Sequence, residues 1–241
     1  MKNSLFLMLL LVFSACQTTK IKNHNFKIST TAVELGSIGE STSLLSLQND
    51  FKTKALPKLE NEIRLSIDII PFNKRLAKMY NSKLEFNQSQ PDINYVDSLS
   101  VKPELAILRI LDITGFVSEL NAVYNKDIRE LLFNTRNLQV VSSIAIALSN
   151  EDLVKIRQAD SYYLNNAQQK FYTLSLYKQG KKIEVLNIAS AEVLGYGLGK
   201  FCWSEIKRKW RIEDIVDKND SCNGNTTSRP SSKKEKNIFK L

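Results

Sequence analysis

The segment from Phe171 to Ile188 constrains the fold most, because two alternating runs flank a turn that contains glycine. Tyr172, Leu174 and Leu176 alternate with Phe171, Thr173, Ser175 and Tyr177, and in the second run Ile183, Val185 and Asn187 alternate with Glu184, Leu186 and Ile188. Lys178-Gln179-Gly180-Lys181 lies between the two runs. A period of two residues is typical of a strand with one buried face, and a short glycine turn joins antiparallel neighbours. The sequence therefore predicts a β-hairpin.

Further strands are predicted by other alternating or continuously apolar runs. Apolar and polar residues alternate from Ile63 to Ile70, and Pro71 follows. Two nearly all-apolar runs, 105–113 and 138–148, match strands that are buried on both faces. Residues 201–216 favour strands, since Trp210, Ile212, Asp214 and Val216 alternate with other residues. A helix is the alternative, because Trp203, Ile206 and Trp210 would share one helical face.

Helices are predicted over 72–84 and 114–132, where apolar residues recur at helical spacing, and over 149–163, where a capping residue is followed by acids in the first turn. Thr114 and Ser149 can cap the second and the third of these helices. The chain shows no repeat and no internal linker. It therefore predicts a single α+β domain with a mainly antiparallel sheet and two or three helices.

The N-terminus combines a positive charge, an apolar run and a cysteine. Lys2 precedes an uninterrupted apolar run from Leu5 to Phe13, and two small residues then stand before Cys16. This run is less than half of the roughly 20 residues that a helix needs to cross a bilayer. The pattern favours a cleaved export signal over residues 1–15, not a transmembrane helix.

The residues Phe13-Ser14-Ala15-Cys16 resemble the lipobox of bacterial lipoproteins, although Phe13 stands where that family prefers leucine. The resemblance covers only the first sixteen residues. It implies that Cys16 is acylated and becomes the mature N-terminus, and two or three acyl chains hold a protein on a membrane. Gln17, which is not aspartate, implies the outer membrane, with the periplasmic or exterior face left open. The alternative is an ordinary secretory signal with a late cysteine.

Composition divides the rest of the chain. Polar residues 16–31 predict a lipidated tether, residues 32–222 a globular domain, and residues 223–241, rich in Asn, Ser and Lys, a disordered basic tail. With the first cysteine acylated, Cys202 and Cys222 remain in an oxidising compartment, so we expect one disulfide. It would close a loop of about 20 residues and stabilise the fold by roughly 3 kcal/mol.

The chain is basic, with 34 Lys and Arg against 25 Asp and Glu, a formal charge of +9. Removal of residues 1–15, which include Lys2, leaves +8 (33 − 25). The cations are dispersed among acids and the chain is exported, so we expect no nucleic-acid partner. Lys20, Lys22 and Lys27 follow the attachment point and could each gain about 1 kcal/mol beside an anionic surface. Solvated lysines are the alternative.

The residues for several catalytic chemistries are missing. His24 is the only histidine, and it lies in the predicted tether. This argues against nucleophile–His catalysis and His-ligated zinc, and the sequence shows no nucleotide-binding motif. We predict no metal site, no cofactor and no catalytic residue. Paired carboxylates remain open, because Asp68, Asp112 and Asp160 lie near predicted element ends; the alternative is turn, cap and surface acids.

Aromatic residues near the cysteines are the candidate ligand-binding residues. Tyr196, Trp203 and Trp210 could line a groove for a sugar or a peptide, although packing around the disulfide would use the same residues. The glycines at 195, 197 and 199 would share one face of a strand, which suggests close approach of another backbone.

These observations leave three classes of function. The first is a lipid-anchored cell-envelope protein with a non-enzymatic binding or scaffolding role, whose partner is another envelope protein or a cell-wall glycan. The second is a lipoprotein that captures a glycan or peptide for a neighbouring transporter. The third is a carboxylate-dependent hydrolase. The sequence favours the first, because it lacks the usual catalytic sets.

Overall fold

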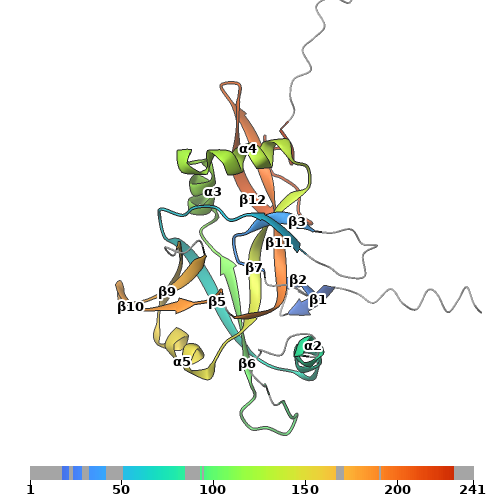
Figure 1. Cartoon of the computed structure of the whole chain (residues 1–241), viewed down its shortest axis with the longest axis vertical. Coiled ribbons are helices and arrows are strands. Elements are labelled where there is room, and N and C mark those ends of the chain that lie inside the picture. Colours follow the sequence, from blue (N-terminus) through green and yellow to red (C-terminus); the bar gives the residue numbers. More distant parts are fainter. Residues whose placement is uncertain are drawn as a thin grey trace, which may run out of the picture.

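One antiparallel sheet is the framework of the protein (Figure 1). The computed structural model describes residues 18–21, 24–28, 33–41, 51–84, 93, 95–166, 171–189 and 191–230. The strands are β1 (Thr18–Ile21), β2 (His24–Ile28), β3 (Ile38–Ser41), β4 (Phe51–Ala55), β5 (Ile63–Pro71), β6 (Glu104–Ile110), β7 (Leu138–Ala147), β8 (Ser161–Asn166), β9 (Tyr172–Lys178), β10 (Lys181–Asn187), β11 (Glu192–Ile206) and β12 (Lys209–Asp217).

The strands follow the order β1-β2-β11-β7-β6-β5-β8-β9-β10, and β12 pairs with β11 while β3 pairs with β4 and β7. The helices are α2 (Lys74–Leu84), α3 (Ile113–Asn121), α4 (Lys126–Asn134) and α5 (Asn150–Gln158), with a 3-10 turn, η2 (Val123–Asn125), before α4. The α+β class with a mainly antiparallel sheet is thus confirmed. The described residues contain four α-helices, so the prediction of two or three was wrong.

The additional helix arises because the predicted helix over 114–132 is interrupted. Ala122 has an extended backbone (ψ 159°), and it separates α3 from η2 and α4. The buried Asn125 side chain donates to the backbone oxygens of Lys58 and Glu119, at 2.8 and 2.9 Å. The bond to Lys58 holds the break between α3 and α4 against the segment that connects β4 to β5, although Lys58 is 67 residues away along the chain.

Two other predicted helix boundaries differ from the structure. Asp112, not Thr114, caps α3, since its carboxylate accepts from the Gly115 N–H at 2.8 Å. Ser149 caps α5 as predicted and accepts from Asp152 N–H at 3.1 Å. The helix ends at Gln158, however, and the residues expected to continue it begin β8, which pairs with β5 and β9.

The predicted hairpin is confirmed as β9 and β10, with Gln179 and Gly180 at the turn. Both turn residues have positive φ, 51° and 73°, as expected for the two-residue turns that suit the twist of a hairpin. The predicted strands at 63–70, 105–113, 138–148 and 201–216 correspond to β5, β6, β7 and the β11–β12 pair.

Strands β1 and β2 lie within the segment that the sequence predicted to be a flexible tether. Phe26 is completely buried and Ile21 nearly so, and both pack with Leu76 and Tyr80 of α2. Burial of these two apolar side chains favours strand pairing over a solvated linker. Figure 1 shows β1 and β2 at the edge of the sheet, above α2.

Strand β2 pairs with β11 next to a glycine. A Cβ atom at Gly195 would lie 3.0 Å from the Lys27 carbonyl oxygen and 3.2 Å from the Phe26 Cβ. The close backbone approach predicted for the three glycines of this stretch is therefore present at Gly195, where it lets β2 join the sheet.

The C-terminal part is held by a disulfide and a short β-bridge. Cys202 and Cys222 form the predicted disulfide, with their Cα atoms 5.6 Å apart. Trp203 and Thr227 exchange backbone hydrogen bonds of 2.8 and 2.9 Å. Residues 223–230 of the predicted disordered tail thus have defined positions, whereas residues 231–241 lie outside the described residues.

The predicted export signal and Cys16 also lie outside the described residues, so the lipobox assignment stays a prediction. Among the residues that the structure does describe, no helix is long and apolar enough to cross a membrane.

Candidate functional site

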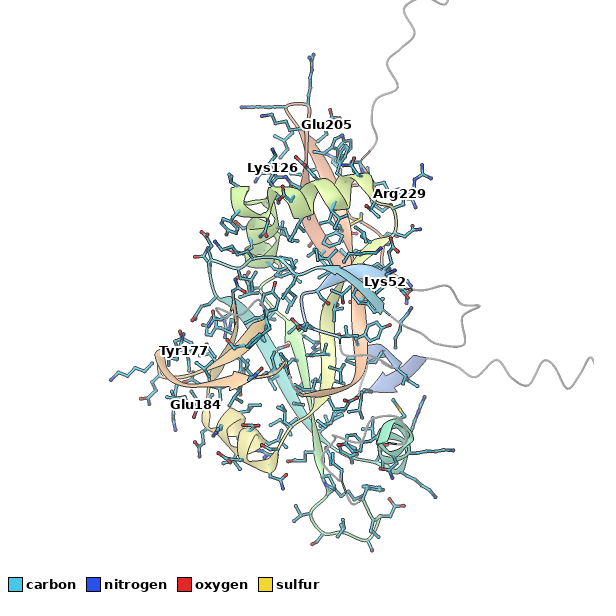
Figure 2. The ribbon with its side chains drawn as sticks, in the orientation of Figure 1. Lys52, Lys126, Tyr177, Glu184, Glu205 and Arg229 are labelled. Atoms are coloured by element: carbon cyan, nitrogen blue, oxygen red, sulfur yellow. A yellow bond between two sulfur atoms is a disulfide. The ribbon has the colours of Figure 1, made fainter. Side chains whose placement is uncertain are left out.

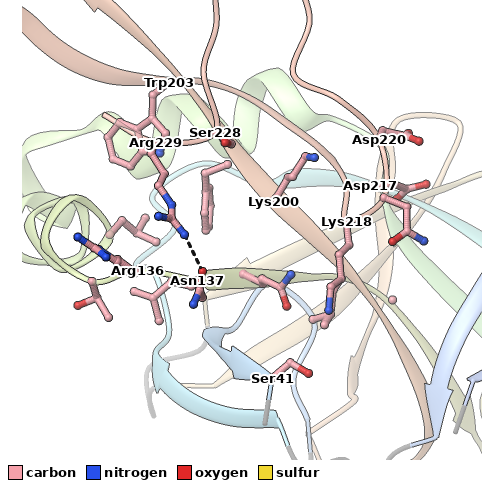
Figure 3. A pocket seen from close by; sticks show the side chains of 18 of the residues that line it. Ser41, Arg136, Asn137, Lys200, Trp203, Asp217, Lys218, Asp220, Ser228 and Arg229 are labelled. Carbon is pink, nitrogen blue, oxygen red and sulfur yellow. Dashed lines mark hydrogen bonds between the residues drawn. The ribbon is translucent and has the colours of Figure 1, made fainter. Parts of the chain in front are cut away.

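A pocket of about 1060 Å³ opens beside residues 196–203 of β11, where five parts of the chain meet (Figure 3). Its wall includes β2, the end of β3, the connection from α4 to β7, β11 itself and the segment that follows β12. The β2–β11 pairing and the Trp203–Thr227 bridge bring these distant segments together. The site therefore depends on the sheet topology and not on one local motif.

Five cationic side chains line this pocket: Lys27, Arg136, Lys200, Lys218 and Arg229. None of them forms an ion pair with another residue in the described part of the chain, although seven other Lys or Arg residues there do. Unpaired cations that converge on one cavity are the arrangement expected for recognition of an anion. We name these five residues the cationic cluster.

Lys27 is a half-buried member of the cluster. Its Nζ donates a hydrogen bond to Ser41 Oγ on β3. Burial, and secondarily the neighbouring Lys218 ammonium, lower the pKa of Lys27 to about 8. Both causes disfavour the charged form, and an anion bound beside the two lysines would favour it again.

Arg229 is positioned by the loop between α4 and β7. Its guanidinium donates to Asn137 Oδ1 at 3.0 Å (Figure 3). Asn137 has a φ of 63°, a left-handed conformation that asparagine tolerates better than most residues. Figure 2 shows Arg229 close to the end of α4. One hydrogen bond to a neutral amide leaves other guanidinium N–H donors available to a ligand.

Of the three aromatic residues predicted to bind a ligand, two line the pocket and one does not. Tyr196 and Trp203 both line the pocket, but only 1% and 3% of their surfaces are exposed. Trp210 lies on β12 and is not among the lining residues. Phe133, which sequence reasoning missed, is 41% exposed and packs edge-on against Trp203 with ring centroids 6.3 Å apart. Among the aromatic residues that line the pocket, Phe133 is therefore the one whose side chain is exposed enough to contact a ligand.

Two acids, Asp217 and Asp220, also line the pocket, so the charge of its lining is +3 (five cations minus two acids). No group of three or more His, Cys, Asp or Glu residues within the described ranges is arranged to hold a metal ion. The net positive lining suits an anion better than a cation.

The three candidate catalytic acids have separate structural partners. Asp68 pairs with Arg109 across β5 and β6 at 3.1 Å. Asp112 caps α3, and exposed Asp160 accepts from the Gln179 N–H at 2.6 Å. The hydrogen bond from Gln179 is the largest cause that lowers the pKa of Asp160.

A shallow second pocket contains both Asp112 and Glu62. Burial acts to raise the pKa of Glu62, but hydrogen bonds from Lys182, Asn165 and Tyr177 outweigh it and lower the pKa. Glu62 is thus stabilised as a carboxylate that ties the β9–β10 hairpin to β5. These contacts favour structural roles for the acids.

No local pattern indicates the cationic cluster, since its first and last members, Lys27 and Arg229, are 202 positions apart (229 − 27). Only the strand pairing shows that they share a cavity. Comparisons with known proteins give no further guide, because no protein-family model, no curated protein and no solved structure matches the chain.

Proposed function

We propose that this chain is an exported, lipid-anchored protein of the cell envelope that binds an anionic ligand in the pocket beside β11. One observation carries the proposal: five cations from distant parts of the chain line one cavity, and none is ion-paired within the described residues. We propose binding as the role, because the cations of the lining outnumber its acids and suit recognition of an anion.

The size and chemistry of the pocket define the ligand class. Small-molecule sites enclose about 300–1,000 Å³, so a cavity of about 1060 Å³ could hold an oligosaccharide or a short peptide. Lysine and arginine favour carboxylate or phosphate groups, and each charge-assisted hydrogen bond contributes about 1.5–3 kcal/mol. Phe133 and Asn137 add an apolar surface and an amide at the wall.

The location is supported by the N-terminal resemblance to bacterial lipoproteins. An acylated Cys16 would hold the protein on a membrane, and Gln17 favours the outer membrane. A disulfide between Cys202 and Cys222 is compatible with such an oxidising compartment. A binding protein at this location could act alone or pass its ligand to a neighbouring transporter.

Titration calorimetry with three anionic probes would test the proposal: trigalacturonate, a triglutamate peptide and inorganic phosphate. Neutral galactose oligomers and triglutamine are the matched controls for charge. We expect at least one anionic probe to bind and its neutral counterpart to fail. Lys200→Gln should weaken that binding about tenfold or more, since one charge-assisted bond is lost.

Lys126→Gln is the matched control variant, because Lys126 is an exposed lysine of α4 that pairs with Glu130 at 3.7 Å and does not line the pocket (Figure 2). Its affinity should equal that of the unmodified protein. Equal weakening by both variants would indicate a general charge effect, and the pocket assignment would then be rejected.

A further inference from the structure

The predicted lipid attachment lies directly beside the first strand. Only Gln17 separates Cys16 from Thr18, where β1 begins. Two residues of extended chain span at most about 7 Å. The polar interface on each side of a bilayer is of similar depth, roughly 5–8 Å. An acylated Cys16 would therefore hold this edge of the sheet against the headgroups and not at a distance from them.

Helix α2 is the element that packs beneath this edge. Its residues Leu76, Ala77 and Tyr80 share one buried cluster with Ile21 of β1 and Phe26 of β2. The outer face of the helix carries the exposed Lys74, Arg75 and Lys78, and the sequence 74–84 contains no acid. Cations on such a surface are attracted to anionic lipid over a Debye length of about 8 Å.

An exposed loop in which three apolar side chains alternate with polar ones, Asp97 among them, lies next to the start of α2. The loop enters β6 at Glu104, and its Pro103 carbonyl oxygen accepts from the Phe72 N–H at 2.7 Å. Val96, Leu99 and Val101 of this loop are 48%, 40% and 82% exposed. Figure 1 shows the loop, in green, extending below α2. The Phe72–Pro103 hydrogen bond thus places the loop, with its exposed apolar side chains, beside the helix that carries the cations.

We propose that this surface binds the membrane that carries the anchor, with the loop entering the lipid interface and α2 contacting anionic headgroups. Its residues, which we name the membrane face, are Lys74, Arg75, Lys78, Val96, Leu99 and Val101. The combination of an apolar tip and flanking cations is that of interfacial membrane binding. The inference rests on the acylation of Cys16 that the proposed function includes.

Fluorescence quenching tests this orientation in the acylated protein. Leu99→Trp places a reporter at the loop tip, and the protein is reconstituted in vesicles of phosphatidylglycerol and phosphatidylcholine with brominated acyl chains, which quench tryptophan on contact. We expect the added tryptophan to lose its fluorescence. Val123→Trp, at another exposed apolar position, between α3 and α4, is the matched control and should keep its fluorescence.

A combined variant separates the contribution of charge. The triple variant with Lys74→Gln, Arg75→Gln and Lys78→Gln lacks three cations. Each cation increases the population in which this surface faces anionic lipid about fivefold, so the triple variant should reduce that population about 100-fold relative to other orientations. The quenching of Leu99→Trp should then disappear, and it should be weak in vesicles of phosphatidylcholine alone.

Two failures can be told apart. Mass spectrometry of the N-terminal peptide reads the acylation: an unmodified Cys16 would overturn the anchor and with it the reason to assign this surface to lipid. An acylated protein whose Leu99→Trp reporter stays as bright as Val123→Trp would overturn the membrane face alone, and the anchored binding function would stand.

Discussion

Replacing Lys218 with glutamine should raise the pKa of Lys27 and stabilise the fold at neutral pH. The Lys218 ammonium is the neighbouring like charge that lowers the pKa of Lys27, second in size only to burial. Two like charges in contact repel by about 1 kcal/mol in water and about 4 kcal/mol near a protein surface. Because Lys27 is only half-buried and solvent screens the pair, we use about 1 kcal/mol, which corresponds to a rise of roughly 0.7 in pKa.

The effect on stability should depend on pH in a defined direction. In the folded protein the pKa of Lys27 is about 8, below its ordinary value of 10.5, so between these values the unfolded chain binds more protons. The free energy of unfolding therefore rises with pH in this window, and below about pH 8 the destabilisation is fully present. Lys218→Gln should stabilise by up to about 1 kcal/mol at pH 7, and this gain should shrink as Lys27 loses its proton above pH 8.

Carbon-13 NMR of labelled lysine Cε groups measures this titration directly, with Lys27→Gln to assign the signal. Urea unfolding at pH 7 and pH 10 measures the stability, and Lys126→Gln serves as the control because Lys126 lies outside the pocket. The reasoning would be refuted by a Lys27 signal that titrates near 10.5 in the unmodified protein, or by one that Lys218→Gln leaves unchanged.

Three further outcomes are expected. If anion binding restores an ordinary pKa to Lys27, the protein should take up about 0.7 proton on binding at pH 8.5 and about 0.1 at pH 7. Calorimetry in buffers of different ionisation enthalpy measures this uptake, and equal uptake at both pH values would contradict the prediction. Replacing Cys202 and Cys222 together by serine should lower the free energy of unfolding by roughly 3 kcal/mol in urea titrations, and a loss below about 0.5 kcal/mol would exclude a stabilising crosslink. Asp112→Ala should cost about 1 kcal/mol through the lost α3 cap, whereas Thr114→Ala should cost less.

The elements with strong local periodicity were predictable from the sequence. The alternation on both sides of Gly180 and the apolar run at 138–148 are patterns among residues that are adjacent in the chain. Both patterns predict strands, and the structure contains these strands as β9, β10 and β7. The disulfide was predictable from the cysteine number and the predicted oxidising compartment. These signals need no knowledge of tertiary contacts.

The missed features depend on contacts between distant residues. The helix interruption before α4 involves Asn125 and Lys58, which are 67 residues apart. Strands β1 and β2 are short and polar, and their place in the sheet follows from the burial of Ile21 and Phe26 against α2. The cationic cluster is assembled only by strand pairing, so dispersed charge in the sequence gave no sign of it.

The edge position of β1 has a mechanical consequence. β1 pairs only with β2 in the described sheet, through four residue pairs that start at Thr18 and Lys27. Tension on an acylated Cys16 would load these pairs one after another, and release of all four residues would lengthen the connection by about 13 Å. Because Lys27 also lines the pocket, a pull on such an anchor would act first on a wall of that pocket.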